Sequence, residues 1–168
     1  QLLMALKKNY IKNKTGTQFN ERGPYVKAIY DSLNFELTNA QIKVLREIRS
    51  DLQSNKPMNR LIQGDVGSGK TIVAMLAASI VIGNDSQVAV MAPTEILAEQ
   101  HYISFLEYCE KVDITCGILI GAHTAKQKQQ IKDDLKNGKI QLIVGTHALI
   151  QGTVEFNNLG MIIIDEQH

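Results

Sequence analysis

The sequence lacks the features of a secreted, disulfide-bonded or membrane-spanning chain. It has only two cysteines, Cys109 and Cys116, and their spacing fits no metal-binding template. Two cysteines build no disulfide framework, so we interpret them as buried or incidental thiols in a reducing cytosol. No apolar run approaches the roughly 20 residues that span a membrane, and no signal peptide is visible. These absences predict a cytoplasmic protein with no membrane partner.

Long low-complexity tracts are also missing, and no charge of one sign dominates. The net charge of +1 over 168 residues neither favours nor excludes a nucleic-acid partner, because basic patches can lie within a neutral total. With 44% hydrophobic residues, the chain has the size and composition of one ordinary domain with a real core. It begins at Gln1 and stops at His168, and both ends suggest a piece of a longer protein.

The strongest signal that is present is a glycine-rich stretch that fits G-x-x-x-x-G-K-[ST]. It consists of Gly64, Asp65, Val66, Gly67, Ser68, Gly69, Lys70 and Thr71. The short apolar run at 61–62 predicts a strand before it. The apolar residues that follow predict a helix from about Gly69 to Gly83, with Gly83 in the left-handed conformation. Strand, glycine loop and helix are the context in which this motif binds phosphate.

Each position of the loop has a physical reason. The glycines permit backbone conformations that a side chain forbids. The loop N–H groups then form an anion nest, supported by the positive end of the following helix. Lys70 adds a mobile positive charge for the β- and γ-phosphates, and the Thr71 hydroxyl can occupy one position on a bound Mg²⁺. The loop therefore predicts binding of a nucleoside triphosphate.

A second acidic signal lies near the end of the sequence. Residues 162–164 are three isoleucines, followed directly by Asp165 and Glu166. Buried acids are costly without a cation or donors, and Mg²⁺ held by Thr71 would meet Asp165. Glu166 lies one residue further, where it could orient or deprotonate an attacking water. The alternative is an exposed turn that happens to carry two acids.

The remaining pattern alternates strands with helices. Further strands are predicted at 88–92, 114–120, 140–144 and 161–164, and helices at 24–33, at 38–52, after Thr94 and at 124–137. This order indicates an α/β domain with a parallel sheet, whose ligands bind at the carboxyl ends of the strands. The loop at Gly64, the turn at Pro93 and Thr94, the turn at 145–147 and the acids at 165–166 all fall at that edge.

Two features that precede the glycine loop each allow two interpretations. Residues 1–14 predict an amphipathic helix with four lysines, which either contact a nucleic-acid backbone or form a solvated face. As Thr124 and Gln127 do later in the sequence, Thr38 and Gln41 predict a capping box at a helix start. Gln41 either caps that helix alone or also hydrogen-bonds an adenine edge, since an amide has a donor and an acceptor.

Taken together, the motifs resemble those of the superfamily 2 helicases and translocases, most closely the RecG-like DNA helicases of bacteria. The matching segments are 35–41 (FELTNAQ), 64–71 (GDVGSGKT), 92–101 (APTEILAEQH), 145–151 (GTHALIQ) and 165–168 (DEQH). The final Gln167 and His168 favour this group over transcription-repair coupling factors. The resemblance implies a RecA-like P-loop NTPase domain at 35–168, with helices on both sheet faces, preceded by a helical lead-in segment at 1–34.

The resemblance also implies roles. ATP and Mg²⁺ would be the cofactors, with Gln41 on adenine, Lys70 and Thr71 on phosphates and metal, Asp165 on the metal and Glu166 as base. The stretches from Pro93 and Thr94, and from Gly145, Thr146 and His147, would grip the DNA backbone. Gln167 and His168 belong to the last motif, and His168 would help to couple hydrolysis to DNA. The expected substrate is branched DNA, such as stalled forks and Holliday-type junctions.

The RecG-like resemblance further implies a second RecA-like motor domain with an arginine finger, and an N-terminal wedge domain. Neither lies in this sequence, and an arginine finger contributes roughly 10³–10⁵ in turnover. We therefore expect these 168 residues alone to hydrolyse ATP hardly at all. Two alternatives stay open: another nucleic-acid-stimulated ATPase of the superfamily, and a nucleotide switch without turnover.

Overall fold

The computed structural model describes residues 16–20, 23–64 and 69–165. Four strands form one sheet in the order β2-β3-β1-β4, and every neighbouring pair is parallel. The strands are β1 (Gln87–Met91), β2 (Cys116–Leu119), β3 (Leu142–Gly145) and β4 (Leu159–Ile164). The helices are α2 (Tyr25–Ser32), α3 (Asn39–Gln53), α4 (Lys70–Gly83), α5 (Glu95–Glu110) and α6 (Ala125–Lys136), with a short 3₁₀ helix η1 (His147–Ile150). The predicted α/β fold with a parallel sheet is confirmed.

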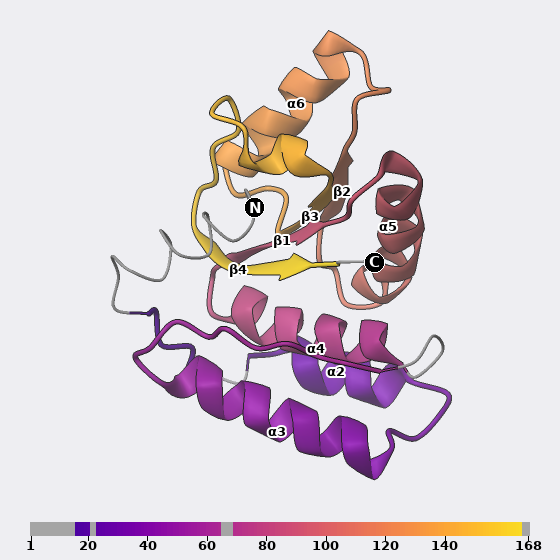
Figure 1. Ribbon diagram of the computed structural model, residues 1–168, viewed down its shortest axis with the longest axis vertical. Coiled ribbons are helices and arrows are strands. Elements are labelled where there is room, and N and C mark those ends of the chain that lie inside the picture. Colours follow the sequence, from indigo (N-terminus) through magenta and orange to yellow (C-terminus); the bar gives the residue numbers. More distant parts are fainter. Residues whose placement is uncertain (1–15, 21–22, 65–68, 166–168) are drawn as a thin grey trace.

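Helices cover both faces of this sheet (Figure 1). Alternate residues of β1 separate the two cores: Val88 and Val90 pack with α4 and α5, whereas Ala89 and Met91 pack on the side of α6 and η1. This follows from the two-residue period of a strand. The central strands are apolar on both faces because both are buried, as expected in a parallel sheet.

Helix α4 is the buried centre of one face. Its residues from Ile72 to Ile82 are almost all buried, including Ser79. It packs on the sheet with one side, and α2 and α3 cover its other side (Figure 1). A helix that is apolar all round needs such cover on every side. The first turn of α4, which follows the glycine loop, is therefore held by both the sheet and the outer helices.

One buried polar side chain, that of Gln87, stabilises the edge of the sheet at which the strands begin. Gln87 is only 4% exposed. Its Nε2 donates to the carbonyl oxygens of Leu135 and Ile140, both at 2.8 Å, and its Oε1 accepts from the Asn158 N–H at 2.9 Å. All of its amide groups are thus used, which is the condition for burying them at little cost. The contacts join α6, β3 and β4 to the start of β1.

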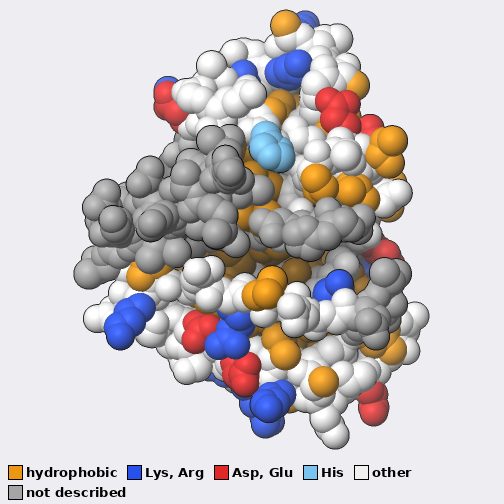
Figure 2. All heavy atoms as spheres, viewed as in Figure 1, with side chains coloured by type: hydrophobic (Ala, Val, Ile, Leu, Met, Phe, Trp, Pro, Cys, Tyr) orange, Lys and Arg blue, Asp and Glu red, His pale blue; other side chains and the backbone are white. Residues whose placement is uncertain are grey.

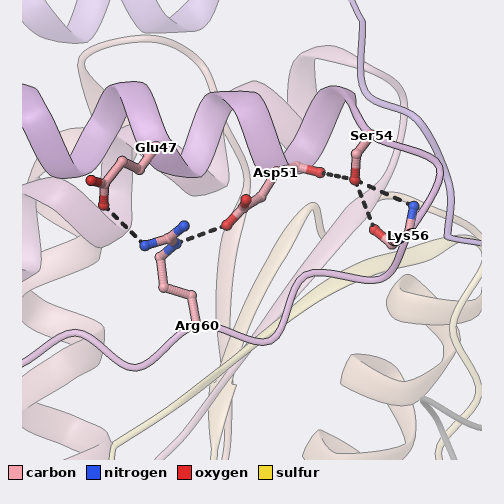
Figure 3. Close-up of polar contacts among 5 residues, drawn as sticks. All are labelled: Glu47, Asp51, Ser54, Lys56 and Arg60. Carbon is pink, nitrogen blue, oxygen red and sulfur yellow. Dashed lines mark hydrogen bonds and ion pairs between the residues drawn. The ribbon is translucent and has the colours of Figure 1, made fainter.

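The strand predicted at 61–62 is wrong. The described residues 57–64 form no strand, and Leu61 is 78% exposed. Both edges of β1 are already occupied by β3 and β4. The segment is instead tied to α3 by Arg60, whose Nε lies 2.7 Å from Asp51 and whose Nη1 lies 3.0 Å from Glu47 (Figure 3). The hydrogen bond that Arg60 donates to Asp51 raises the pKa of Arg60.

The predicted left-handed conformation at Gly83 is also wrong. Gly83 is the last residue of α4, and the left-handed residue is Asp85, with φ of 60°. Aspartate tolerates that region better than most side chains. Gly83 lies against Gly23, where an added Cβ would stand 2.8 Å from the Gly83 Cα, so the close approach requires glycine at position 23.

The two predicted capping boxes are confirmed. Thr38 and Gln41 form the predicted capping box of α3, and Thr124 and Gln127 form the same motif at α6. The two cysteines are free thiols, and a hydrogen bond with Cys109 raises the pKa of Cys116, as does burial.

None of the helices in the described ranges is long and apolar enough to cross a membrane. The helix expected at 1–14 lies outside the described residues.

Candidate nucleotide-binding and catalytic site

Three of the predicted site segments converge at the carboxyl edge of the sheet. The pairing of the central strands continues past their ends: the Ala92 N–H donates to the Gly145 carbonyl at 2.9 Å, and the Asp165 N–H donates to the Met91 carbonyl at 2.9 Å. Pro93 and Thr146 follow directly, so the three segments are neighbours. The first turn of α4 lies on the same side of the molecule as the tip of β4 (Figure 1).

The structure describes the two ends of the glycine loop, at Gly64 and at Gly69. Gly69 is the N-cap of α4 with φ of 79°, and no side chain caps the helix there. The Lys70 Nζ donates to the Gly64 carbonyl at 2.8 Å, which brings the ammonium back to the start of the loop. The uncapped N–H groups and the ammonium are together a donor set for phosphate oxygens. Residues Asp65, Val66, Gly67 and Ser68 lie outside the described residues.

Gln41 joins its helix to this loop. Its Oε1 accepts from the Thr38 N–H at 2.9 Å, which is the capping interaction, and its Nε2 donates to the Gly69 carbonyl at 3.4 Å. Capping and proximity to the phosphate loop are therefore both present in one side chain. Contact between Gln41 and adenine stays a prediction.

The contact at Asp165 was not predicted from sequence. The His101 Nε2 lies 2.7 Å from the Asp165 Oδ2, although the residues are 64 positions apart. A signal for it exists in α5: the buried residues Ala98 and Phe105 stand three positions before and four after His101. A histidine at helical spacing within an inward-facing stripe has to meet a partner in the core or at its edge.

The residues expected to grip DNA lie at the same edge. Pro93, Thr94 and His147 are exposed, and the Thr94 side chain caps α5 by accepting from the Leu97 N–H at 3.2 Å. Thr146 is half-buried and precedes η1. Gly145 is buried, and a Cβ there would lie 2.8 Å from the Leu119 carbonyl, so close packing requires glycine. Gln167 and His168 lie outside the described residues.

The charges around the site form no single basic patch on the face that Figure 2 shows. Lys and Arg side chains are interspersed there with Asp and Glu. This distribution agrees with the net charge of +1. The face shown therefore offers no broad positive field.

The donor chemistry fits Mg²⁺ held together with a nucleotide. Thr71 offers a hydroxyl and Asp165 a carboxylate, the oxygen ligands that Mg²⁺ prefers. Among the described residues no group of three or more His, Cys, Asp or Glu is placed to hold a metal. A sparse protein donor set is what Mg²⁺ uses when phosphates and water complete its coordination.

Gly69 provides a test of the loop geometry. We expect Gly69→Ala to weaken nucleotide binding and to lower the free energy of unfolding by roughly 1–2 kcal/mol, because φ is positive there. The added methyl would also clash with the Gln41 Nε2. Binding of a fluorescent ATP analogue and urea unfolding measure the two effects. Gly152→Ala is the matched control, since a Cβ there meets nothing within 4 Å. Equal binding by both variants would contradict the role of Gly69.

Comparison with known proteins places these features in context. The family description that matches is DEAD/DEAH box helicase, over residues 38–168. An ATP-dependent DNA helicase RecG from Aquifex aeolicus is 48% identical over the whole chain, which covers 21% of that protein. The counterpart from Thermotoga maritima is 53% identical over 87% of the chain and 19% of the protein. The chain thus spans about a fifth of the length of these relatives.

Solved structures show the same relationship. A structure of RecG bound to a three-way DNA junction matches 84% of the chain and 20% of its own length, with a TM-score of 0.80 and 54% identity. The UvsW helicase of bacteriophage T4 matches 95% of the chain and 47% of its own length, with a TM-score of 0.58 and 17% identity, which shows a shared fold. The resemblance that the sequence motifs indicated, to superfamily 2 helicases and RecG in particular, is confirmed.

Proposed function

Since the chain belongs to the DEAD/DEAH box helicase family, we propose that residues 35–168 are the ATP-binding motor domain of a RecG-like DNA helicase. Residues 1–34 are its helical lead-in segment. The whole protein remodels stalled replication forks and branched recombination intermediates. The observation that carries this proposal is the convergence of the 92–94, 145–147 and 165 segments at one sheet edge, in a chain 54% identical to a RecG solved on a DNA junction.

In this proposal the loop binds the phosphates of ATP. Its N–H groups and the start of α4 provide donors, and Lys70 follows the β- and γ-phosphates. The Thr71 hydroxyl and the Asp165 carboxylate hold Mg²⁺, which neutralises charge on the phosphates when it is bound. Gln41 stands beside Gly69, where its amide can contact adenine while it caps α3. Glu166 orients and deprotonates the attacking water.

The DNA partner contacts the same edge of the domain. The Thr94 hydroxyl, the start of the 16-residue helix α5 and the exposed His147 are the kinds of group that contact a nucleic-acid backbone without reading its sequence. Gln167 and His168 connect this surface to the catalytic acids. A second RecA-like motor domain and an N-terminal wedge domain complete the enzyme, and the arginine finger comes from the second motor domain.

Two other functions are less well supported. A transcription-repair coupling factor has a similar motor, but the relatives described above are RecG helicases. A nucleotide switch without turnover has no need of Glu166, which directly follows Asp165 in this sequence. The variant Glu166→Gln distinguishes a switch from an ATPase, because ATP turnover should fall only if Glu166 acts as a base.

Activity of the full-length protein tests the proposal. We expect it to unwind forked or four-way DNA only with ATP and Mg²⁺, and its ATP hydrolysis to rise when branched DNA is added. The 168 residues alone should give no unwinding, and hydrolysis lower by roughly 10³–10⁵, because they do not include the proposed second motor domain and its arginine finger. Gel-based unwinding and a phosphate-release assay measure both. Unwinding by the chain alone, or hydrolysis indifferent to DNA, would contradict the proposal.

A further inference from the structure

The contact between α5 and the tip of β4 gives His101 a defined chemical environment. Its Nε2 lies 2.7 Å from the Asp165 Oδ2, and the two side chains are 25% and 26% exposed. An ionised carboxylate only accepts hydrogen bonds, so the Nε2 carries the proton and donates. One carboxylate oxygen is therefore engaged by the histidine, and the Oδ1 is left for another ligand.

We propose that His101 is a positioning residue for the metal site: it holds the Asp165 carboxylate in the orientation in which the Oδ1 serves Mg²⁺. The proposal rests on the proposed function, since it takes Asp165 to be a metal ligand. The Asp165 backbone is fixed by its N–H bond to the Met91 carbonyl. That bond leaves the two side-chain torsions undetermined, and the hydrogen bond from His101 determines them. Carboxylates that bind metals are commonly held by such outer hydrogen bonds.

His101 is itself held by a rigid element. Helix α5 is anchored by the buried side chains of Ala98, Phe105 and Cys109. The His101 ring packs against the Phe105 ring, with centroids 6.5 Å apart and planes inclined at 51°. A group that stands on a packed helix positions its partner more accurately than a group on a loop does. Thr94 is the N-cap of this helix, so the residue that orients the carboxylate moves with the segment proposed to contact DNA.

Three substitutions separate positioning from a purely structural contact. His101→Phe keeps a ring against Phe105 and removes the donor. His101→Gln places an amide nitrogen near the position of the Nε2, which contacts Asp165. His101→Asn is one methylene shorter and places its amide nitrogen near the position of the Nδ1, further from Asp165. The glutamine and asparagine variants are matched in chemistry and differ in reach. If one variant fails to fold, as thermal unfolding would show, the other two still distinguish a positioning role of His101 from a purely structural one.

The measurement is the affinity of the full-length protein for a fluorescent ATP analogue, with Mg²⁺ and separately with EDTA. For His101→Phe and His101→Asn we expect affinity in Mg²⁺ to fall by roughly 10–100-fold, the usual effect of losing such an outer partner, and affinity in EDTA to stay unchanged. For His101→Gln we expect affinity within a few-fold of the unsubstituted protein under both conditions. ATP turnover should follow the same order.

Either of two results would overturn the proposal. Unchanged affinity of the phenylalanine variant in Mg²⁺ would show that Asp165 needs no orientation by His101. An equal loss in Mg²⁺ and EDTA would show that His101 supports the fold of the pocket rather than the metal ligand. Failure of the proposed function itself looks different: the unsubstituted protein would then bind no analogue, or bind it equally well after Lys70→Ala.

Discussion

Replacing Lys70 by alanine is expected to weaken the binding of a fluorescent ATP analogue by this chain by roughly 10–100-fold. The Nζ of Lys70 lies 2.8 Å from the Gly64 carbonyl oxygen, so the ammonium lies at the start of the phosphate loop. A hydrogen bond to a charged group contributes about 1.5–3 kcal/mol, which is roughly 10–100-fold in affinity. Turnover should fall further, by roughly 10²–10³, as it does when one donor to a developing charge is removed.

The control for this variant is another exposed lysine. Lys139 lies just before β3, at the opposite edge of the sheet, and Lys139→Ala changes net charge by the same amount. We expect it to bind like the unsubstituted chain when the analogue is titrated in Mg²⁺. Equal affinities for all three proteins would remove Lys70 from the site. Binding by none of them would assign the site to the full-length, two-motor enzyme, in which the same comparison is then repeated.

The elements that could be predicted from the sequence are those specified by short-range patterns. The capping boxes at Thr38 and Thr124 involve residues three positions apart, and such a pattern carries its own geometry. The strands β1 and β3 contain the continuous apolar runs 88–91 and 142–144, and burial on both faces of a parallel sheet accounts for these runs. The sheet edge that carries the site followed from the same alternation of strands and helices.

The elements that could not be predicted depend on partners far apart in sequence. Leu61 and Ile62 have the composition of a strand, but a strand requires a neighbour. In the described residues Arg60 ties this segment to Asp51 and Glu47 instead. Both edges of β1 are occupied by β3 and β4, so these two apolar residues find no strand partner there. A two-residue run is therefore weak evidence for a strand.

His101 shows the same limit within the site. Its contact with Asp165 spans 64 positions, and no spacing rule in the sequence connects a helix to the end of a strand that follows two crossovers. The sequence does place His101 on the stripe between Ala98 and Phe105. It does not say which buried partner the ring meets, because that depends on how α5 packs against the sheet. The two adjacent acids at 165 and 166 could be identified in the sequence as candidates, whereas the contact of Asp165 with His101 could not.

Replacing Glu166 by glutamine in the full-length protein is expected to reduce ATP hydrolysis by roughly 10²–10⁴, the contribution of a positioned general base. Glu166 lies outside the described residues, but it directly follows Asp165, whose N–H is fixed to the Met91 carbonyl. Glutamine keeps the size of the side chain and removes its basicity. Affinity for a fluorescent ATP analogue should therefore stay within a few-fold, and so should affinity for branched DNA.

Asp165→Asn is the informative companion, because the two acids have different proposed roles. It removes charge from the proposed metal ligand, so it should weaken nucleotide binding in Mg²⁺ but not in EDTA, whereas Glu166→Gln should leave binding intact in both. Phosphate release at saturating ATP and branched DNA, together with analogue titration, separates the two patterns. Unchanged hydrolysis by Glu166→Gln would rule out the base assignment and favour a nucleotide switch. Loss of hydrolysis by Glu166→Gln with nucleotide binding retained would mean that this domain hydrolyses the ATP that it binds, because a base is needed only for turnover.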